Sequence, residues 1–203
     1  MPPEVGSSEG VFRQEILDAI ARLLVDDTLD RVRITTVLRT ANVSRGTFYF
    51  YYASKEDAFA ALLDQVYARM VPPFEQLFAD SAARRPAVLA KSVAAWLTFG
   101  AVESGVLRTA VEEWPRHAGI REVHLAAQRR MTGAVKRALD TDRREGIAPP
   151  GIASSTLASA LVWTMERAWY EAATSRQGTA VADLDAVTEA LGATFVAAMY
   201  GRP

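Results

Sequence analysis

The sequence predicts an all-α protein, and three observations support this prediction. Strong helix formers dominate, chiefly alanine, leucine, arginine and glutamate. No stretch sustains the alternation of apolar and polar residues that marks a half-buried strand. Short clusters of glycine, proline, serine and aspartate divide the chain into segments of helical length. With 203 residues, half of them hydrophobic, the chain is long enough to bury a core without disulfides or metals. We expect about nine helices from these breaks in the pattern.

The composition excludes several classes of protein. There is no cysteine, which excludes disulfides, thiolate metal sites and cysteine nucleophiles. The first ten residues lack the basic and apolar regions of a signal peptide. The uncharged stretch around Trp96, residues 92–102, is too short to cross a bilayer. We therefore expect a soluble, cytoplasmic protein with no membrane association, no metal and no other cofactor.

Two short helices are expected near the N-terminus after a longer one. Ser7 or Ser8 can cap the first helix. Its apolar stripe consists of Phe12, Ile16, Ala19, Ile20, Leu23 and Leu24. A second helix fits residues 34–40, with Ile34, Val37 and Leu38 facing inward.

A tight turn at residues 41–43 connects the second helix to a third. Asn42 stands where the chain needs a left-handed residue, which asparagine tolerates better than other non-glycine residues. Ser44 can cap the third helix, which runs from Arg45 to about Tyr51. Two helices joined by such a turn form a helix-turn-helix, and the N-terminal residues of its second helix face base edges in the major groove.

The charge distribution supports this interpretation, although the net charge of the chain is only −1. From Arg31 to Lys55 the chain has no acidic residue, while three aspartates precede this window and Glu56 and Asp57 follow it. The basic residues of the window are Arg31, Arg33, Arg39, Arg45 and Lys55. Such a window is typical of a small DNA-binding module within a larger protein. A solvated loop with a chance charge bias is the alternative.

The start of the third helix carries residue types that read DNA. Arg45 can bind guanine through two hydrogen bonds, and Thr47 offers a methyl group to thymine or a hydroxyl to phosphate. Gly46 permits a close approach of the backbone. Together with the cap, the DNA-binding candidates are Arg33, Ser44, Arg45, Gly46, Thr47, Tyr49, Tyr51 and Lys55.

The aromatic residues of the third helix divide into two groups. Tyr49 and Tyr51 are expected on the exposed flank, where their hydroxyls can donate to phosphates. Phe48 and Tyr52, four residues apart, are expected to pack on the first helix. Lys55 lies in the first turn of the next helix, where its ammonium and the backbone amides can bind one phosphate. An ordinary aromatic core segment is the alternative.

The remaining chain is expected to be helical. Ser54 and Asp57 form a capping-box pattern that opens a fourth helix. Pro72 and Pro73 are expected to stop or kink it, so the length of this helix is left open. Further helices are predicted at 86–103, 105–113, 119–144, 152–175 and 184–200.

Aromatic residues gather in the C-terminal half, where an unusual glutamate lies among them. Glu166 falls within a stripe at helical spacing. The other members of this stripe are Ser159, Val162, Trp163, Trp169, Tyr170 and Ala173. A buried carboxylate needs a partner, either an arginine or a ligand. The alternative is that these aromatic residues are plain core.

The chain shows no pattern typical of an enzyme. His117 and His124 are seven residues apart without a third residue at metal-ligand spacing, so we expect solvated surface histidines. A glycine-rich phosphate loop, a carboxylate pair and a nucleophile with its base are all missing from the sequence.

The segment 34–56, with its Ser-Arg-Gly-Thr-Phe-Tyr-Phe-Tyr-Tyr run at 44–52 and Ser-Lys-Glu at 54–56, resembles the signature of the TetR family of bacterial transcriptional repressors. Short matches at 47–51, 98–100, 165–167 and 200–201 resemble the ethionamide-resistance repressor branch of that family. The resemblance is strong over residues 29–66 and patchy elsewhere. Asn42 replaces the usual turn glycine, and Leu38 stands where alanine is common.

The resemblance implies an all-α, Ω-like homodimer with three N-terminal DNA-binding helices and six helices for ligand binding and dimerisation. We place the division at 9–53 and 54–203. Arg45, Gly46, Thr47, Tyr49, Tyr51 and Lys55 fall on operator-contacting positions of the family. Phe99, Met131, Met165, Glu166, Tyr170 and Phe195 match positions that line an apolar ligand tunnel, where Val162 replaces a polar residue. Trp96 and Trp163 from the same aromatic cluster complete the ligand-binding candidates.

The function that we expect is a ligand-responsive regulator. It binds a double-stranded palindromic operator as a homodimer, and a hydrophobic small-molecule effector releases it. The last two long helices, 152–175 and 184–200, are expected to form the dimer interface, with Leu191 and Thr194 in it. A helical protein-interaction or scaffold module without a DNA function is the alternative. That alternative leaves the acid-free window from Arg31 to Lys55 unexplained.

Overall fold

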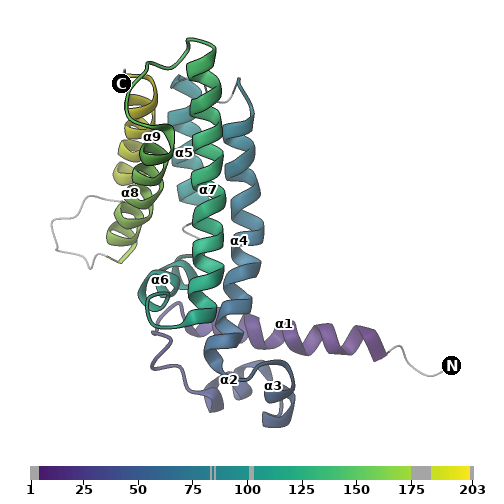
Figure 1. Cartoon of the computed structure of the whole chain (residues 1–203). Helices are drawn as coiled ribbons and strands as arrows, with labels where there is room; N and C mark the ends of the chain where they lie inside the picture. Colours follow the sequence, from purple (N-terminus) through teal and green to yellow (C-terminus); the bar gives the residue numbers. More distant parts are fainter. Residues whose placement is uncertain (1–4, 83, 85, 101–102, 175–183, 202–203) are drawn as a thin grey trace. The chain divides into compact units, whose positions relative to one another are not determined.

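The computed structural model is all-α in the residues that it describes, which are 5–82, 84, 86–100, 103–174 and 184–201 (Figure 1). These residues form nine helices, as the sequence predicts. By packing, the chain divides into two compact units. Unit 1 comprises residues 1–66 and 104–124, and unit 2 comprises residues 67–103 and 125–203. The sequence-based division at residue 53 separates the first three helices from the rest, whereas packing extends unit 1 to residue 66 and adds residues 104–124.

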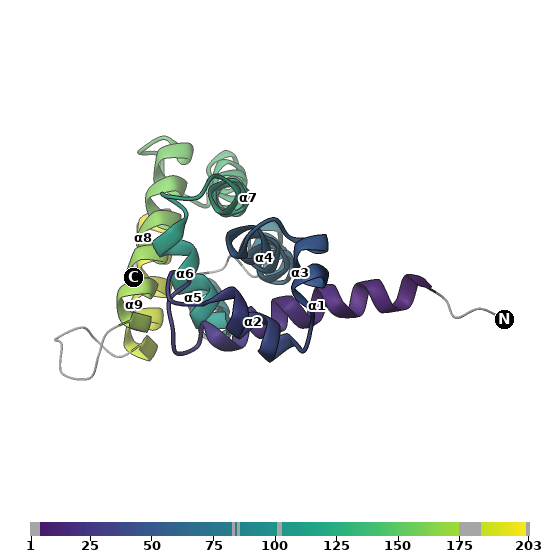
Figure 2. The same cartoon turned by 90° about the horizontal axis from the view of Figure 1, so that it is seen from below.

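Unit 1 contains α1 (Val5–Leu23), α2 (Ile34–Ala41), α3 (Arg45–Tyr51) and α6 (Ser104–Glu113), which Figure 2 shows from below. Its core includes Ile16, Ile20, Val37 and Phe48, all fully buried. These residues come from three helices that are too short to bury an apolar face alone. Their mutual packing therefore stabilises unit 1 more than intrinsic helix propensity does.

Two expectations for the first helix are wrong. The helix begins at Val5, before the serines at 7 and 8 that were expected to cap it. Phe12 is 43% exposed and lies outside the core, which begins at Ile16. The apolar stripe was read correctly from Ile16 onward, whereas residues 10–15 of α1 are exposed.

The turn between α2 and α3 follows the prediction. Asn42 has a left-handed conformation with φ of 52° and ψ of 42°. The amide of Val43 then donates to the carbonyl of Leu38 at 3.0 Å, which closes the end of α2. The Ser44 hydroxyl accepts from the Thr47 amide at 3.0 Å and caps α3. Local turn chemistry thus fixes the direction in which α3 leaves α2.

Helix α4 (Lys55–Ala79) continues through Pro72 and Pro73, so these prolines do not stop it. Both are exposed, while Val71 and Phe74 on the inner side are fully buried. Solvent can therefore satisfy the carbonyls that lose their partners, and burial of the inner face offsets the lost hydrogen bonds. The indole of Trp96 donates to the carbonyl of Met70 at 2.9 Å in the same turn.

Unit 2 contains α5 (Pro86–Gly100), α8 (Ser154–Thr174), α9 (Leu184–Tyr200) and most of α7 (Ala118–Arg144). Figure 1 shows α5, α8 and α9 side by side. The contact of α5 with α9 is close, since a Cβ atom at Gly192 would lie 2.2 Å from the Ala90 carbonyl oxygen. Predicted helix ends agree within about two residues, except that residues 101–102 lie outside the described part.

A buried ion pair ties three segments of unit 2 together. Arg84 donates to both carboxylate oxygens of Asp142, with Nη2 at 2.9 Å and Nε at 3.1 Å. The same guanidinium donates to the carbonyl of Phe78 near the end of α4. Tyr200 donates to Asp142 at 2.8 Å, and burial together with this bond raises the pKa of the tyrosine. The network joins the ends of α4, α7 and α9.

In the described residues, no helix is both long enough and apolar enough to cross a membrane.

Candidate functional site

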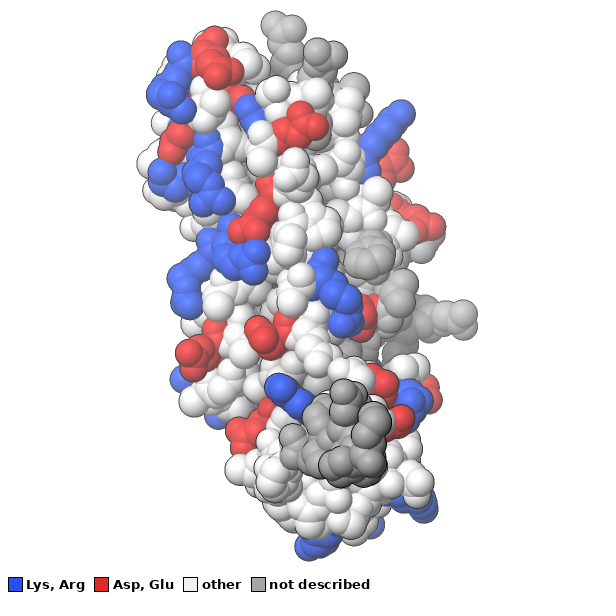
Figure 3. Space-filling model, turned by 90° about the vertical axis from the view of Figure 1, so that its right-hand side faces the viewer, with Lys and Arg blue, Asp and Glu red and all other residues white. Residues whose placement is uncertain are grey.

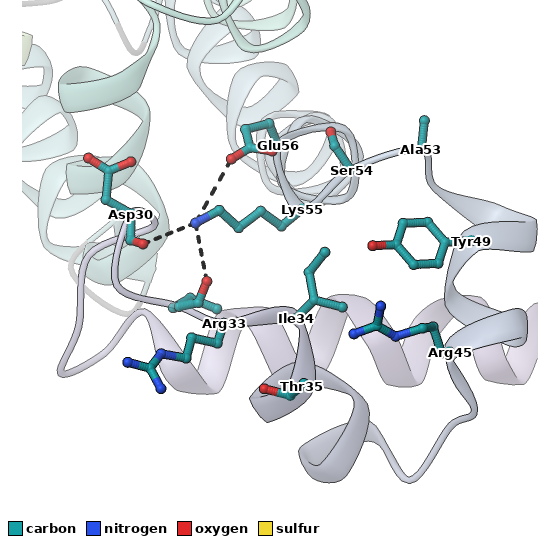
Figure 4. A pocket seen from close by; sticks show the side chains of 11 residues that line it. Asp30, Arg33, Ile34, Thr35, Arg45, Tyr49, Ala53, Ser54, Lys55 and Glu56 are labelled. Atoms are coloured by element: carbon teal, nitrogen blue, oxygen red, sulfur yellow. Dashed lines mark hydrogen bonds and ion pairs between the residues drawn. The ribbon is translucent and has the colours of Figure 1, made fainter.

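A groove of about 540 Å³ opens in unit 1 beside the helix-turn-helix (Figure 4). Its lining mixes polar and apolar surface and comes from α2, α3, the start of α4 and the loops that precede α2 and α4. Arg45 and Tyr49 point into it from α3, and Lys55 reaches across it from α4. The full lining is Asp30, Val32, Arg33, Ile34, Thr35, Arg45, Tyr49, Ala53, Ser54, Lys55 and Glu56. Four of the predicted DNA-binding residues therefore line one concave surface: Arg33, Arg45, Tyr49 and Lys55.

At the N-terminus of α3, hydrogen bonds fix the side chains of the cap, while the side chain of Arg45 is exposed to solvent. The Ser44 and Thr47 hydroxyls share a hydrogen bond of 2.8 Å, which fixes both side chains. Arg45 is exposed and has no hydrogen bond or ion pair with any described residue. A Cβ atom at Gly46 would meet only the Ser44 hydroxyl, at 3.7 Å. The packing of the chain itself therefore does not require glycine at this position. The missing side chain leaves space in which an external partner can approach the backbone.

The aromatic residues of α3 lie as predicted. Phe48 is fully buried and Tyr52 is 6% exposed. The Tyr52 hydroxyl accepts from Arg13 Nε of α1 at 3.3 Å, so α3 is anchored to the first helix. Tyr49 is 45% exposed and Tyr51 is half-buried. Phe50 is 72% exposed, so the exposed side of α3 includes one aromatic residue more than predicted.

Lys55 has a structural role that the sequence did not reveal. Its ammonium donates to the carbonyls of Leu29 at 2.6 Å, Asp30 at 3.1 Å and Val32 at 3.2 Å. A lysine has three N–H donors, and these three bonds use all of them. The side chain therefore braces the turn that precedes α2. A phosphate bound to Lys55 would either add to these three hydrogen bonds or compete with them. Phosphate binding by Lys55 therefore stays a prediction.

Charges around the groove are mixed. Arg33 is exposed at the N-cap of α2 and makes no side-chain capping bond. Acidic groups sit on the same wall, with Glu56 3.9 Å from Lys55 and the exposed Asp30 4.0 Å from Arg116. Beyond this wall, Figure 3 shows Lys and Arg without Asp or Glu at the end where α2 and α3 lie. Positive potential therefore gathers at the tip of the reading helices and at the free amides of the α2 N-terminus.

Helix α6 is fastened to the end of α1 inside unit 1. Arg108 Nη2 donates to the carbonyls of Leu24 and Asp27, both at 2.8 Å. A Cβ atom at Gly105 would lie 2.5 Å from the Leu24 carbonyl oxygen. Only a glycine allows this approach of the two backbones. The sequence carried no signal for this contact because its partners are about 80 residues apart.

Three of the eight predicted ligand-binding residues are buried in the interior of unit 2. Met131, Met165 and Phe195 are buried at 4%, 2% and 0% exposure. Glu166 is half-buried and accepts a hydrogen bond from Gln128 Nε2 of α7. Burial, and then the charge of Glu166, raise the pKa of Tyr67 on α4. The sequence predicted that Glu166 needs an arginine or a ligand as a partner. The structure gives it Gln128, which the sequence analysis did not identify.

The other ligand-binding candidates are more scattered. Trp96 is half-buried and packs on Phe74, with ring centroids 4.9 Å apart. Tyr170 is half-buried under the guanidinium of Arg167. Phe99 lies in α5, but its side chain is outside the described part of the structure. Trp163 is 39% exposed, which disagrees with a place in an enclosed chamber of one chain. The inward face of α8 is centred on Val162, Met165 and Trp169, about one residue from the predicted stripe.

The expectation of two solvated histidines is wrong. His124 is fully buried and stacks on Trp114, with ring centroids 5.5 Å apart. It shares the inner face of α7 with Ile120 and Ala127, at helical spacing. His117 is half-buried, with Nε2 3.3 Å from Glu113. Among the described residues, no group of histidine, aspartate or glutamate is arranged to hold a metal ion.

Basic residues also occur along α7 in unit 2, and Figure 3 shows Lys and Arg together with Asp and Glu at its upper left. Several of them form ion pairs with neighbours. Arg130 lies 2.6 Å from Glu75, whose pKa it lowers, and Lys136 lies 2.6 Å from Asp140. Such pairs are ordinary on a solvated helix and contribute little each. They distinguish this face from the tip of α3, where Arg45 has no partner.

Two family models match this chain, one in its N-terminal part and one in its C-terminal part. The family described as "Bacterial regulatory proteins, tetR family" matches residues 16–62, which span α1 to the start of α4. The family described as "Transcriptional regulator EthR, C-terminal domain" matches residues 77–201. The chain belongs to the TetR family of transcriptional regulators. Members of this family are regulators and not enzymes, in agreement with the sequence prediction.

Known relatives of this TetR-family regulator agree with its placement. It is 23% identical to the HTH-type transcriptional regulator EthR of Mycolicibacterium smegmatis over 162 residues, which are 80% of this chain and 75% of that protein. Its fold is similar to that of FadR from Bacillus subtilis, solved in complex with stearoyl-CoA, at a TM-score of 0.73, 15% identity and coverage of 92% and 99% of the two chains. It is also similar to the fold of FadR from Thermus thermophilus, solved in complex with lauroyl-CoA, at a TM-score of 0.61 and 21% identity. The match covers 94% of this chain and 96% of that chain.

Proposed function

We propose that this TetR-family regulator is a repressor that binds a palindromic operator as a homodimer and is released by a hydrophobic small molecule. The observation that carries the DNA-binding part is the groove of unit 1, where Arg45 is exposed and unpaired at the tip of a rigidly capped helix. An exposed arginine without a partner among the described residues, at this position, is available for base recognition. The site of action is then the cytoplasm, where bacterial DNA lies.

Base recognition is assigned to the tip of α3. Arg45 is proposed to donate two hydrogen bonds to guanine O6 and N7. The shared hydrogen bond of Ser44 and Thr47 directs their hydroxyls to each other, so we assign the methyl group of Thr47 to a thymine contact. Gly46 is proposed to let the α3 backbone approach the bases or the sugar-phosphate chain.

Phosphate contacts are assigned to the walls of the groove. Tyr49 and Tyr51 are proposed to donate their hydroxyls, and Arg33 its guanidinium, to backbone phosphates. The free amides at the start of α2 add positive potential beside Arg33. Lys55 is proposed to act chiefly by holding residues 29–32, which carry Arg33 in position. The Lys55 side chain is 18% exposed, and its positive charge adds to the groove while the ammonium stays in the brace.

The homodimer is assigned to the outward faces of α8 and α9. A single α3 reads only a few base pairs, so a useful affinity needs two reading heads. The exposed residues of these faces are mostly small or apolar: Ala160, Trp163, Thr164, Ala186, Ala190, Ala193, Thr194, Ala197 and Ala198. Trp163 has a natural place here, as an aromatic anchor between two subunits. Leu191 is 6% exposed and belongs to the core of its own chain.

The effector is assigned to the interior of unit 2. Its buried methionines and Phe195 provide an apolar wall, and Glu166 with Gln128 provides a polar group within it. Two regulators of the same fold were solved with long-chain acyl-CoA ligands, which supports an effector with an apolar body. An effector changes operator affinity only as far as it prefers one state of the protein over another, and operator DNA disfavours the effector by the same factor.

A binding experiment tests this function. Duplexes that the protein enriches from a random-sequence library would be compared with scrambled duplexes in gel-shift titrations at two salt concentrations. We expect an enriched palindrome, tighter binding to it than to scrambled DNA, and weaker binding of both at high salt. Enrichment of no sequence, or equal affinity for all duplexes, would contradict the proposal and would favour a helical protein-interaction module instead.

A further inference from the structure

Two polar atoms in the interior of unit 2 have no hydrogen-bond partner among the described residues. They are Oε1 of Gln128 on α7 and Nε1 of Trp169 on α8. Gln128 is 4% exposed and Trp169 is 5% exposed, so bulk solvent does not reach either side chain freely. Buried polar groups are almost always hydrogen-bonded, and each exception calls for an explanation. These two atoms therefore mark a place where another molecule can complete the structure.

The orientation of the Gln128 amide follows from its neighbour. Its Nε2 donates to a carboxylate oxygen of Glu166. An ionised carboxylate only accepts hydrogen bonds, so the nitrogen must face Glu166 and the oxygen must face away from it. Oε1 is consequently an acceptor that seeks a donor. Trp169 is the complementary case, because an indole N–H only donates and so seeks an acceptor.

The two atoms flank the same carboxylate. Glu166 and Trp169 are three residues apart on α8, which places their side chains next to each other on one face. Gln128 reaches Glu166 from α7. Apolar residues adjoin this cluster, since Met131 is one turn beyond Gln128 and Met165 is one turn before Trp169. The arrangement is a small polar group within an apolar surrounding, as in most small-molecule sites.

Another tryptophan of unit 2 has a hydrogen-bond partner for its indole N–H. Trp96 is also packed in the interior, and its Nε1 donates to the carbonyl of Met70 at 2.9 Å. No described residue offers such a carbonyl to Trp169. Unlike Trp96, Trp169 therefore keeps a donor that the described residues leave open for a ligand.

We propose that the effector carries, next to its apolar body, a neutral group that both donates and accepts hydrogen bonds, such as a primary carboxamide, with its N–H bound to Gln128 Oε1 and its oxygen bound to Trp169 Nε1. This inference rests on the proposed function, since it names the chemistry of that same effector. A carboxylate offers no donor to Gln128, and its charge is repelled by Glu166. An ester or tertiary amide offers an acceptor to Trp169 alone. An amide that keeps an N–H, such as a primary carboxamide, offers a donor to Gln128 and an acceptor to Trp169.

Three probes of equal chain length separate these possibilities: decanamide, N,N-dimethyldecanamide and decanoate. Calorimetric titration of the full chain with each probe gives its affinity. We expect decanamide to bind roughly fivefold to tenfold more tightly than either of the others, as one additional satisfied hydrogen bond implies. Equal affinities for decanamide and its dimethyl analogue, or no binding of decanamide, would overturn the proposal.

Variants identify the two partners. Trp169→Phe removes the donor and Gln128→Met removes the acceptor, and each should lower decanamide affinity roughly fivefold to tenfold while changing decanoate affinity less. Tyr200→Phe is the control, because it removes a half-buried donor of unit 2 that already has a partner in Asp142, and it should leave the preference for decanamide intact. Thermal melting of each variant reports whether it folds, and either variant alone suffices for the test. Operator binding by the same preparations reports separately on the proposed function. Binding of decanamide that neither variant weakens would contradict the assignment.

Discussion

The ammonium of Lys55 lies 2.6 Å from the backbone carbonyl oxygen of Leu29. Two more bonds, to Asp30 and Val32, make this lysine the link between the start of α4 and the turn before α2. This brace lies within unit 1, since Lys55 is the first residue of α4 and its three partners precede α2.

Lys55→Met should destabilise the protein and weaken DNA binding to all sequences alike. Hydrogen bonds from a charged donor contribute about 1.5–3 kcal/mol, and methionine keeps the aliphatic stem while losing all of them. Chemical denaturation measures the first effect and gel-shift titration the second.

The salt dependence of the same variant separates two roles of Lys55. If the lysine is only a brace, the slope of log affinity against log salt should stay unchanged. A slope that falls by about one would instead show that the lysine neutralises a phosphate.

Gly105→Ala should lower stability, although alanine normally favours a helix by roughly 0.5–1 kcal/mol over glycine. The new Cβ atom would lie 2.5 Å from the Leu24 carbonyl oxygen, and one backbone must move. Gly10→Ala in α1 is the control, since nothing lies within 4 Å of its Cβ position. Thermal melting of both variants checks this, and equal or higher melting temperatures for Gly105→Ala would contradict the close contact of α6 with α1.

Asp142→Asn should be among the most destabilising single changes in unit 2. It leaves Arg84 buried at 7% exposure without its counter-charge, a situation that typically costs about 3–5 kcal/mol. Tyr200→Phe removes only one hydrogen bond to the same carboxylate and should cost about 1 kcal/mol. Urea unfolding gives both values. Similar costs for the two variants would show that the ion pair is not the centre of the network.

Ala190→Glu should give folded monomers that bind DNA weakly. Ala190 is exposed on α9 within the proposed dimer face, whereas its neighbour Leu191 is buried in the core. Leu191→Glu is therefore expected to unfold the chain, so it serves as a contrast and not as an interface probe. Light scattering decides the matter. A mass near 22.1 kDa for the parent protein at micromolar concentration would contradict the dimer.

The local features of the fold were predictable from sequence because they rest on neighbouring residues. Asn42, Ser44 and Ser54 adopt their turn and cap roles through groups within a few residues of each. Phe48 and Tyr52 could be placed inward by their helical spacing. Family resemblance then supplied the architecture that spacing alone does not give.

The long-range features were not predictable, because nothing in the local sequence records them. Lys55 looks like an ordinary first-turn lysine until the turn at 29–32 folds onto it. His124 and Gln128 look polar and solvated, yet the inner face of α7 buries both. Trp163 and Trp169 are alike in sequence, and a rotation of α8 by about one residue decides that one faces outward and the other inward.

Replacement of Arg45 by alanine tests the central claim most directly. The ratio of affinities for an enriched operator and a scrambled duplex would be measured for the parent and for Arg45→Ala at the same salt concentration. We predict that the ratio falls roughly 5–150-fold, as the loss of about 1–3 kcal/mol from a bidentate guanine contact requires, while binding to scrambled DNA changes little. An Arg45→Ala variant that binds the operator as tightly and as selectively as the parent would contradict the assignment of α3 as the reading helix.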